Sequence, residues 1–220
     1  MQIKAVAFDL DGTLYPNYRM YIHSLPFALT HLNLAIQFGK MRKVIRNIRP
    51  ITDFREKQAQ LLARRLSKTE EETKKIIDTI IYTKWEKSFR NIKPYPGVKE
   101  TLIKLKAEGL KIGLMSDFPI KKKLEYLGLS GIWDCAFSSE ECHYLKPNPE
   151  PFQKLVDCFD VPVDNILYVG NNYEYDVIGA AEFGMKTAFL SKSKNHQKPA
   201  DITFRSFKDL LDQVLQHLNN

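Results

Sequence analysis

The chain has 220 residues, of which 44% are hydrophobic, 11% aromatic and 27% charged. That length and composition suit one globular core and exclude a disordered, collagen-like or low-complexity chain. The formal net charge of +7 leaves nucleic acid or a membrane surface open as a partner until the charge is located along the chain.

The first expected element is a buried strand over residues 4–10, a short apolar run that ends in carboxylates. From residue 15 to about residue 91 the spacing is helical, with helices expected at 25–38, 41–48, 54–66 and 69–89. Thr69 followed by three glutamates is a favourable helix start, because acidic side chains complement the first turn.

One stretch, residues 20–39, contains no Lys, Arg, Asp or Glu. Its histidines, asparagine and glutamine make it too polar to span a membrane. Leu25, Leu29, Leu32 and Ile36 share one helical face, which predicts an amphipathic helix of a soluble protein.

After residue 94 the pattern alternates between helix and strand. We expect strands at 111–116, 136–138, 165–170 and 186–190, and helices at 98–108, 120–127, 149–159, 174–183 and from Ser206 onward. Such alternation predicts a parallel sheet with helices on both faces. The predicted fold is therefore α/β: a Rossmann-like core (residues 1–14 and 92–220) with an inserted all-helical cap subdomain (residues 15–91).

The excess positive charge lies in the predicted cap. Residues 15–91 contain 16 Lys or Arg and 7 Asp or Glu, a net charge of +9, and the remainder carries −2. The simpler interpretation is a solvated, lysine-rich helical surface. The alternative is a cap that attracts anionic substrates. No zinc-finger spacing, RNA-binding pattern or basic tail supports a nucleic acid polymer as partner.

The three cysteines, Cys135, Cys142 and Cys158, are an odd number without CxxC spacing. This argues against a disulfide scaffold or a structural zinc site and favours a reducing compartment. The N-terminal residues lead straight into a strand-like run, so no signal peptide is expected. We therefore expect a cytoplasmic protein.

Polar and charged residues stand at the predicted carboxyl ends of the strands, where open α/β sheets bind ligands. They are Asp9, Asp11, Thr13, Ser116, Asp117, Lys146, Asn171 and Asp176. Gathered carboxylates repel one another unless a cation is present, and oxygen ligands favour Mg²⁺. A lysine and a hydroxyl beside such an ion suit a phosphoryl group. Each residue alone has an ordinary structural explanation, so the inference depends on their convergence.

The pattern resembles the four motifs of the haloacid dehalogenase (HAD) superfamily, in the right order along essentially the whole chain. The first is Asp9-x-Asp11-Gly12-Thr13, the second the strand-ending Ser116, the third Lys146-Pro147, and the fourth the stretch from Gly170 to Asp176. The helical insert is placed as in members with a C1-type cap.

The resemblance implies a role for each motif residue. Asp9 is the expected nucleophile, which forms an aspartyl-phosphate, and Asp11 is the expected general acid and then base. Thr13, Ser116 and Lys146 are expected to bind the phosphoryl oxygens. The cofactor is expected to be Mg²⁺, held by Asp9, Asp11, Asn171 and Asp176.

Two positions depart from the family pattern. The fourth motif usually begins Gly-Asp, and here it is Gly170-Asn171, which should weaken metal binding. The second motif usually continues with Asn, and here Asp117 follows Ser116. We hypothesise that Asp117 is an accessory acid that restores the charge lost at position 171.

Candidates for contact with the leaving group are Tyr15, Tyr18 and Arg19, with Arg19 suited to an anion. The tyrosines equally suit a hinge or core role. The expected function is a Mg²⁺-dependent phosphatase of small phosphorylated metabolites such as sugar phosphates or nucleotides, without a nucleic acid polymer or membrane partner. The alternatives are a phosphomutase on the same site, or a weakened phospho-ligand-binding protein because of Asn171. The sequence reveals neither the particular phosphometabolite nor the oligomeric state.

Overall fold

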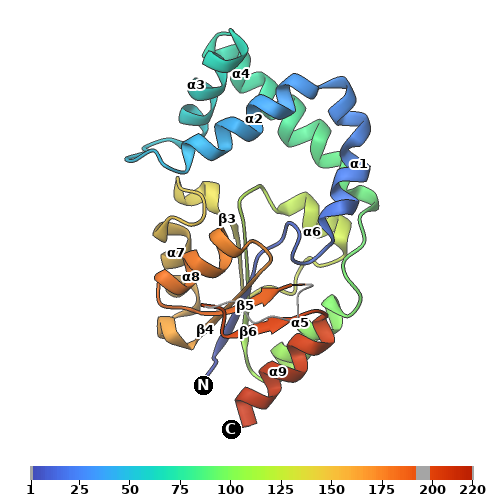
Figure 1. The fold of residues 1–220 in the computed structure, drawn as a ribbon, viewed down its shortest axis with the longest axis vertical. Helices are drawn as coiled ribbons and strands as arrows, with labels where there is room; N and C mark the ends of the chain where they lie inside the picture. The colour runs from blue at the N-terminus through green and yellow to red at the C-terminus, as the bar shows by residue number, and fades with distance from the viewer. Residues whose placement is uncertain (1, 192–198, 220) are drawn as a thin grey trace.

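The computed structural model describes residues 2–191 and 199–219. Its centre is a parallel sheet of six strands in the order β3-β2-β1-β4-β5-β6 (Figure 1). The strands are β1 (Ala5–Phe8), β2 (Lys111–Ser116), β3 (Cys135–Ser138), β4 (Ile166–Gly170), β5 (Lys186–Leu190) and β6 (Ile202–Phe204). The predicted α/β sheet is confirmed. Only β6 was not expected, because three residues are too few to show a periodicity.

Helices cover both faces of the sheet, as the alternating pattern predicts. They are α5 (Val98–Ala107), α6 (Lys121–Leu127), α7 (Pro149–Phe159), α8 (Gly179–Glu182) and α9 (Phe207–Asn219). Short helical turns are η3 (Ser139–Cys142), η4 (Val163–Asn165) and η5 (Tyr173–Ile178). Apolar residues of α5, α6 and α9 pack against one face, and those of α7 and α8 against the other. This burial fixes β1 in the middle, between β2 and β4.

A layer of helices lies across the carboxyl ends of the strands (Figure 1). It consists of α1 (Asn17–Thr30), α2 (Leu32–Ile45), α3 (Phe54–Leu66), α4 (Glu70–Ile76), η1 (Ile77–Trp85) and η2 (Glu86–Asn91). It has an apolar cluster of its own, which includes Phe38, Met41 and Leu62. Thr69 and Glu72 form a capping box at the start of α4, as the sequence predicts. The cap thus has its own core and covers the end of the sheet where the candidate residues lie.

Helix α1 has an unexpected orientation. The expected single helix over residues 25–38 is wrong, because α1 ends at Thr30 and α2 begins at Leu32. Leu25 and Leu29 of α1 are 55% and 74% exposed, and Leu32 and Ile36 of α2 are 59% and 46% exposed. The apolar face of an amphipathic helix normally packs against the core. The exposure of these leucines and of Ile36 therefore differs from what the sequence predicts. In the described ranges, no helix has the length and apolar character needed to cross a membrane.

Cys135 on β3 and Cys158 in α7 form a disulfide, and Cys142 is free. The expectation that the cysteines are unpaired is wrong for these two, because their spacing in sequence does not show that β3 and α7 pack together. Disulfides persist in oxidising environments, so the expected cytoplasmic location stays a prediction.

Candidate active site

Lys146 lies at the centre of a buried charge cluster. Its Nζ donates to Asp9 Oδ1 at 2.7 Å, to Asp176 Oδ1 at 2.6 Å and to the Tyr168 hydroxyl at 3.1 Å. Burial alone would lower the pKa of Lys146, but the carboxylates of Asp176 and Asp9 outweigh it and raise this pKa well above its usual value. The ammonium therefore keeps its charge.

Asp9 follows β1 and is 6% exposed. Its Oδ2 accepts a hydrogen bond from Thr13 Oγ1 at 2.8 Å, and its Oδ1 accepts the one from Lys146. Burial raises the pKa of Asp9 to about 7, with Asp176 and Asp11 adding to the rise and Lys146 opposing it. A neighbouring cation or a pH above 7 favours the ionised form.

Asp11 accepts hydrogen bonds from three side chains. Ser116 Oγ lies 2.8 Å from its Oδ2, Lys123 Nζ lies 2.6 Å from its Oδ1, and the Tyr15 hydroxyl also donates to Oδ1. Burial would raise the pKa of Asp11, but Lys123 outweighs it and, with Tyr15 and Ser116, holds that pKa below its usual value. The carboxylate is therefore fixed in place and ionised at neutral pH.

The turn after β4 is held by Asp176. Its Oδ2 accepts the backbone N–H groups of Asn171 at 3.1 Å and Asn172 at 2.9 Å. A Cβ at Gly170 would lie 2.2 Å from Asp176 Cβ, so only glycine permits this approach. Asn171 Oδ1 lies 3.0 Å from Thr13 Oγ1, which brings the first and fourth motifs into direct contact.

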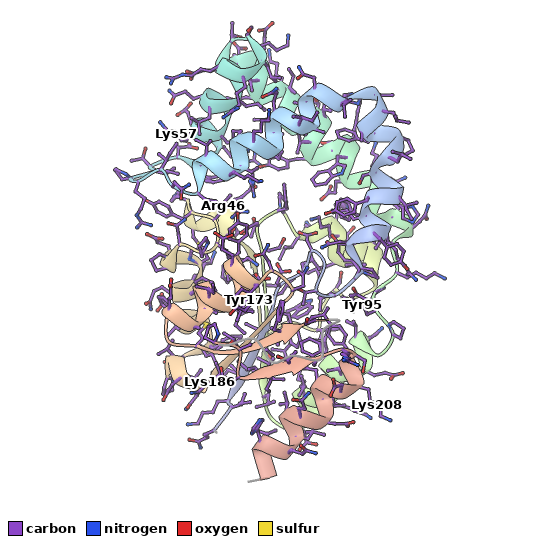
Figure 2. The ribbon with its side chains drawn as sticks, in the orientation of Figure 1. Arg46, Lys57, Tyr95, Tyr173, Lys186 and Lys208 are labelled. Carbon is purple, nitrogen blue, oxygen red and sulfur yellow. A yellow bond between two sulfur atoms is a disulfide. The ribbon has the colours of Figure 1, made fainter. Side chains whose placement is uncertain are left out.

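Asp117 is paired with an arginine of the cap. Arg46 Nη1 of α2 lies 2.6 Å from Asp117 Oδ2, and Asp117 Oδ1 accepts from Ser139 Oγ at 2.7 Å and from the backbone N–H of Lys146 at 3.2 Å. Arg46 lies where cap and core meet (Figure 2). Burial would raise the pKa of Asp117, but Arg46, Lys146 and Arg42 lower it to about 2. The proposed role of Asp117 at a metal site stays a prediction, because its charge is directed at Arg46.

These residues surround a cavity of about 210 Å³. It is lined by residues from the loops after β1 and β2, the Lys146 loop, the turn after β4 with η5, the start of α1 and the end of α2. They are Asp9, Asp11, Asn17, Arg46, Asp117, Phe118, Lys146, Asn171, Asn172, Tyr175 and Asp176. Thr13 and Ser116 are joined to it through Asp9 and Asp11. The structure thus brings the motif residues together at one place.

The three candidates for contact with the leaving group are not among the residues that line this cavity. Tyr15 is fully buried and bonded to Asp11, so it positions the acid. Tyr18 is 57% exposed and lines a neighbouring cavity of about 430 Å³. Arg19 donates to the Tyr18 hydroxyl and the Lys93 carbonyl. Contact of the three candidates with a leaving group stays a prediction, since Tyr15 bonds to Asp11 and Arg19 bonds to Tyr18 and Lys93.

Sequence reasoning missed two cations of this site. Lys123 is 3% exposed, although it stands in a run of three lysines that gives no sign of burial. Arg46 comes from the cap, 71 residues before its partner Asp117. Neither follows a recognisable motif, so no pattern in the sequence distinguishes them from surface residues.

The residues at this cavity that could ligate a metal offer oxygen atoms, from the carboxylates of Asp9, Asp11, Asp117 and Asp176 and from the side-chain amides of three asparagines. This is the chemistry that hard divalent cations prefer. Across the residues that the structure describes, no three His, Cys, Asp or Glu side chains are grouped to hold a metal ion. Lys146 already neutralises part of the acidic charge, through Asp9 and Asp176, and Asn171 contributes none, so a divalent cation here would have few charged ligands.

Buried aspartates and a lysine lie at the strand ends of a parallel α/β sheet beneath a helical layer, the place where sheets of this class bind their ligands. The sequence model of haloacid dehalogenase-like hydrolases matches residues 3–184. The chain belongs to the haloacid dehalogenase-like hydrolase family, and it is an enzyme of that family.

Two sequence relatives are named as phosphatases. The chain is 30% identical to a glyceraldehyde 3-phosphate phosphatase of Methanocaldococcus jannaschii, covering 96% of this chain and 97% of the relative. It is 27% identical to the pyrophosphatase PpaX of Halalkalibacterium halodurans, in a match that covers 97% of this chain and 98% of the relative. Among solved structures, a 2-haloacid dehalogenase from Pseudomonas syringae has a TM-score of 0.73 at 19% identity, covering 98% of this chain and 100% of that one. The structural likeness shows the shared fold, and the sequence relatives indicate phosphatase chemistry.

Proposed function

We propose that the protein is a Mg²⁺-dependent phosphatase of small phosphorylated metabolites that works through an aspartyl-phosphate. The observation that carries the proposal is the buried cluster of Asp9, Lys146 and Asp176 at a cavity beneath the cap. The phosphatase relatives support the reaction class. We assign residues 15–91 to the cap and residues 1–14 and 92–220 to the core.

In the first step, a carboxylate oxygen of Asp9 attacks phosphorus, and the bond from phosphorus to the leaving alcohol breaks. Lys146 and the Thr13 hydroxyl hold the two carboxylate oxygens of Asp9, so the attacking group is fixed before substrate arrives. The Lys146 ammonium also lies close enough to offset negative charge on the transferring group. The leaving alkoxide takes its proton from Asp11 in those molecules in which Asp11 is protonated, a minor fraction at neutral pH because Lys123, Tyr15 and Ser116 lower the pKa of this group.

In the second step, water attacks phosphorus, its proton passes to Asp11, and the bond between phosphorus and Asp9 breaks. The lowered pKa of Asp11 suits this step, because the ionised carboxylate is the base. Because the pKa of Asp11 is lowered, the rate of the first step should depend on pH, since only protonated Asp11 can donate a proton to the leaving alkoxide. Tyr15 and Ser116 position Asp11 for both steps.

A bound Mg²⁺ would be held by Asp9, the backbone carbonyl of Asp11, Asn171 and Asp176. It would supply charge neutralisation between the nucleophile and an incoming phosphate dianion. The oxygen donors support this assignment, and the amide of Asn171 in place of a carboxylate makes weak affinity the expectation.

Asn171 also favours a second candidate, a protein that binds phosphorylated ligands without turning them over. A phosphomutase would use the same residues. Hydrolysis of p-nitrophenyl phosphate, with and without Mg²⁺, separates these candidates when Asp9→Asn serves as the control. A phosphatase requires turnover that depends on the metal and disappears in the variant. Absence of turnover in the unmodified protein, or its persistence in Asp9→Asn, would overturn the proposal.

A further inference from the structure

A second cavity, of about 270 Å³, lies inside the cap beside the phosphate site. Its walls come from three cap elements and one core loop, and they include Phe27, Ala28, Ala35, Phe38, Trp85 and Phe118. Arg46 and Phe118 line both this cavity and the one that holds Asp9, so the two adjoin. We call this second cavity the cap chamber.

Four of the eleven residues that line the cap chamber are aromatic, and two are arginines, Arg42 and Arg46. The ring of Phe118 lies 5.4 Å from that of Trp85 and 6.3 Å from that of Phe38, centroid to centroid, and Phe27 lies 6.4 Å from Trp85. Small side chains at Ala28 and Ala35 leave the space between these rings open. The chamber therefore presents ring faces and edges to whatever occupies it.

Several polar groups at the chamber already make hydrogen bonds within the protein, including Arg46, whose Nη1 donates to Asp117 and to the Lys146 carbonyl. Ser24 Oγ accepts from Trp85 Nε1 at 2.9 Å. Arg42 is 5% exposed and bonds Gln58 Oε1, Glu140 and the Asp117 carbonyl, with its guanidinium 4.4 Å from the centre of the Phe118 ring. Within the described residues, no buried side-chain nitrogen or oxygen lacks a hydrogen-bond partner.

This arrangement disfavours a leaving group rich in hydroxyls. Such a group would give up its hydrogen bonds to water on entering the chamber and would find few free partners there. An apolar or aromatic group loses no hydrogen bonds and removes its surface from water.

We propose that the cap chamber binds the leaving group and selects phosphate monoesters whose alcohol has an apolar or aromatic body with few hydroxyls. This rests on the proposed phosphatase function, and it is narrower than the sugar phosphates and nucleotides that the sequence suggested. A hydroxyl-rich alcohol would instead use the cavity beside Tyr18, Tyr95 and Arg205, which adjoins the site at Asn17 and Asn171.

The first test compares n-hexyl phosphate with glucose 6-phosphate and with methyl phosphate. All three are esters of unactivated primary alcohols, so differences in leaving-group reactivity are small. The proposal predicts a kcat/KM for n-hexyl phosphate about tenfold or more above that for glucose 6-phosphate. Equal values, or a preference for glucose 6-phosphate, would overturn it.

The second test fills the chamber with Ala35→Leu or Ala28→Leu. Each should lower kcat/KM for n-hexyl phosphate about tenfold more than for methyl phosphate, whose alcohol is too short to occupy the chamber. Ala107→Leu is the matched control, because this alanine is exposed at the end of α5 and should leave both values as they are. Equal losses on the two esters in a folded variant would count against the chamber.

The third test measures binding without turnover, and it needs no cap variant. The chain has two tryptophans, Trp85 and Trp133, and the latter packs on Phe8 in the core. In Asp9→Asn with Trp133→Phe, n-hexyl phosphate should change the fluorescence of Trp85 saturably, whereas glucose 6-phosphate should not. Absence of a change with n-hexyl phosphate would overturn the proposal.

The two proposals fail in different ways. If methyl phosphate is hydrolysed only when Asp9 is present, but n-hexyl phosphate is not preferred, the chamber proposal is wrong and the phosphatase stands. If n-hexyl phosphate binds but no ester is hydrolysed, the phosphatase is wrong and the chamber is a ligand site.

Discussion

The ion pair of Arg46 with Asp117 joins cap helix α2 to the loop after β2, and it lies largely buried, with side chains 14% and 12% exposed. Asp117→Asn keeps the size of the side chain and removes its charge. The pKa of Asp117 is about 2 in the folded protein, compared with the ordinary value of 3.8. A shift of this size corresponds to about 2 kcal/mol of folding free energy at neutral pH.

The contribution of Asp117 to the free energy of unfolding depends on pH. Because the pKa is depressed by folding, the stabilisation is present above the unfolded value of 3.8 and is lost as the pH falls toward 2. Asp117→Asn should therefore lower the free energy of unfolding by about 2 kcal/mol at pH 7, and the difference should shrink below pH 4. Urea titrations followed by circular dichroism at several pH values measure both quantities.

The matched control is Arg49→Gln, because Arg49 also links the end of α2 to the core, through Glu150. Those side chains are 47% and 31% exposed, so solvent screens the pair and the urea midpoint should hardly move. Arg46→Ala should lower the free energy of unfolding by more than Asp117→Asn does, by about 3–5 kcal/mol, because it leaves the buried Asp117 carboxylate without its partner. Equal stability of Asp117→Asn and the unmodified protein at pH 7, or a difference independent of pH, would refute the reasoning.

Three further predictions concern other parts of the fold. Lys123→Gln removes the cation that lowers the pKa of Asp11. The pH below which kcat falls should therefore be higher in the variant. The same pH in both proteins would contradict the role of Asp11 as a base. Gly12→Ala should lower the free energy of unfolding by about 1–3 kcal/mol. The φ of Gly12 is +96°, and a Cβ there would lie 2.5–2.6 Å from side-chain atoms of two asparagines. Thermal unfolding measures the loss, and an unchanged midpoint would contradict the prediction. The disulfide between Cys135 and Cys158 spans 23 residues and should contribute about 3 kcal/mol to the free energy of unfolding. Cys158→Ser should therefore lower the urea midpoint. Dithiothreitol should lower the midpoint of the unmodified protein and leave that of the variant unchanged.

Much of the fold and the site could be predicted from local patterns. The apolar runs of β1 and β4 are buried throughout, and such runs are recognisable without knowledge of their partners. Because parallel strands place their carboxyl ends along one edge, the residues that follow β1, β2 and β4 had to meet. Asp9 and Asn171 come directly after β1 and β4, and Ser116 is the last residue of β2.

The rest depended on packing between distant segments. Lys123 and Arg46 are ordinary basic residues in sequence, and only the placement of α6 and α2 brings them to Asp11 and Asp117. The orientation of α1 was also hidden, because Phe27 and Ala28 on its inner face are no more apolar than Leu25 on its outer face. Periodicity identifies a face but does not say which neighbour covers it.

The central claim is that Asp9 becomes covalently phosphorylated during turnover. Borohydride reduces an acyl phosphate to the alcohol, so enzyme quenched with borohydride during hydrolysis of n-hexyl phosphate should carry homoserine at position 9. Peptide mapping by mass spectrometry locates the change. Homoserine at position 9 that depends on substrate is the predicted result. An unmodified Asp9 in an enzyme that turns over, or a modification at Asp11 or Asp176 instead, would contradict the account.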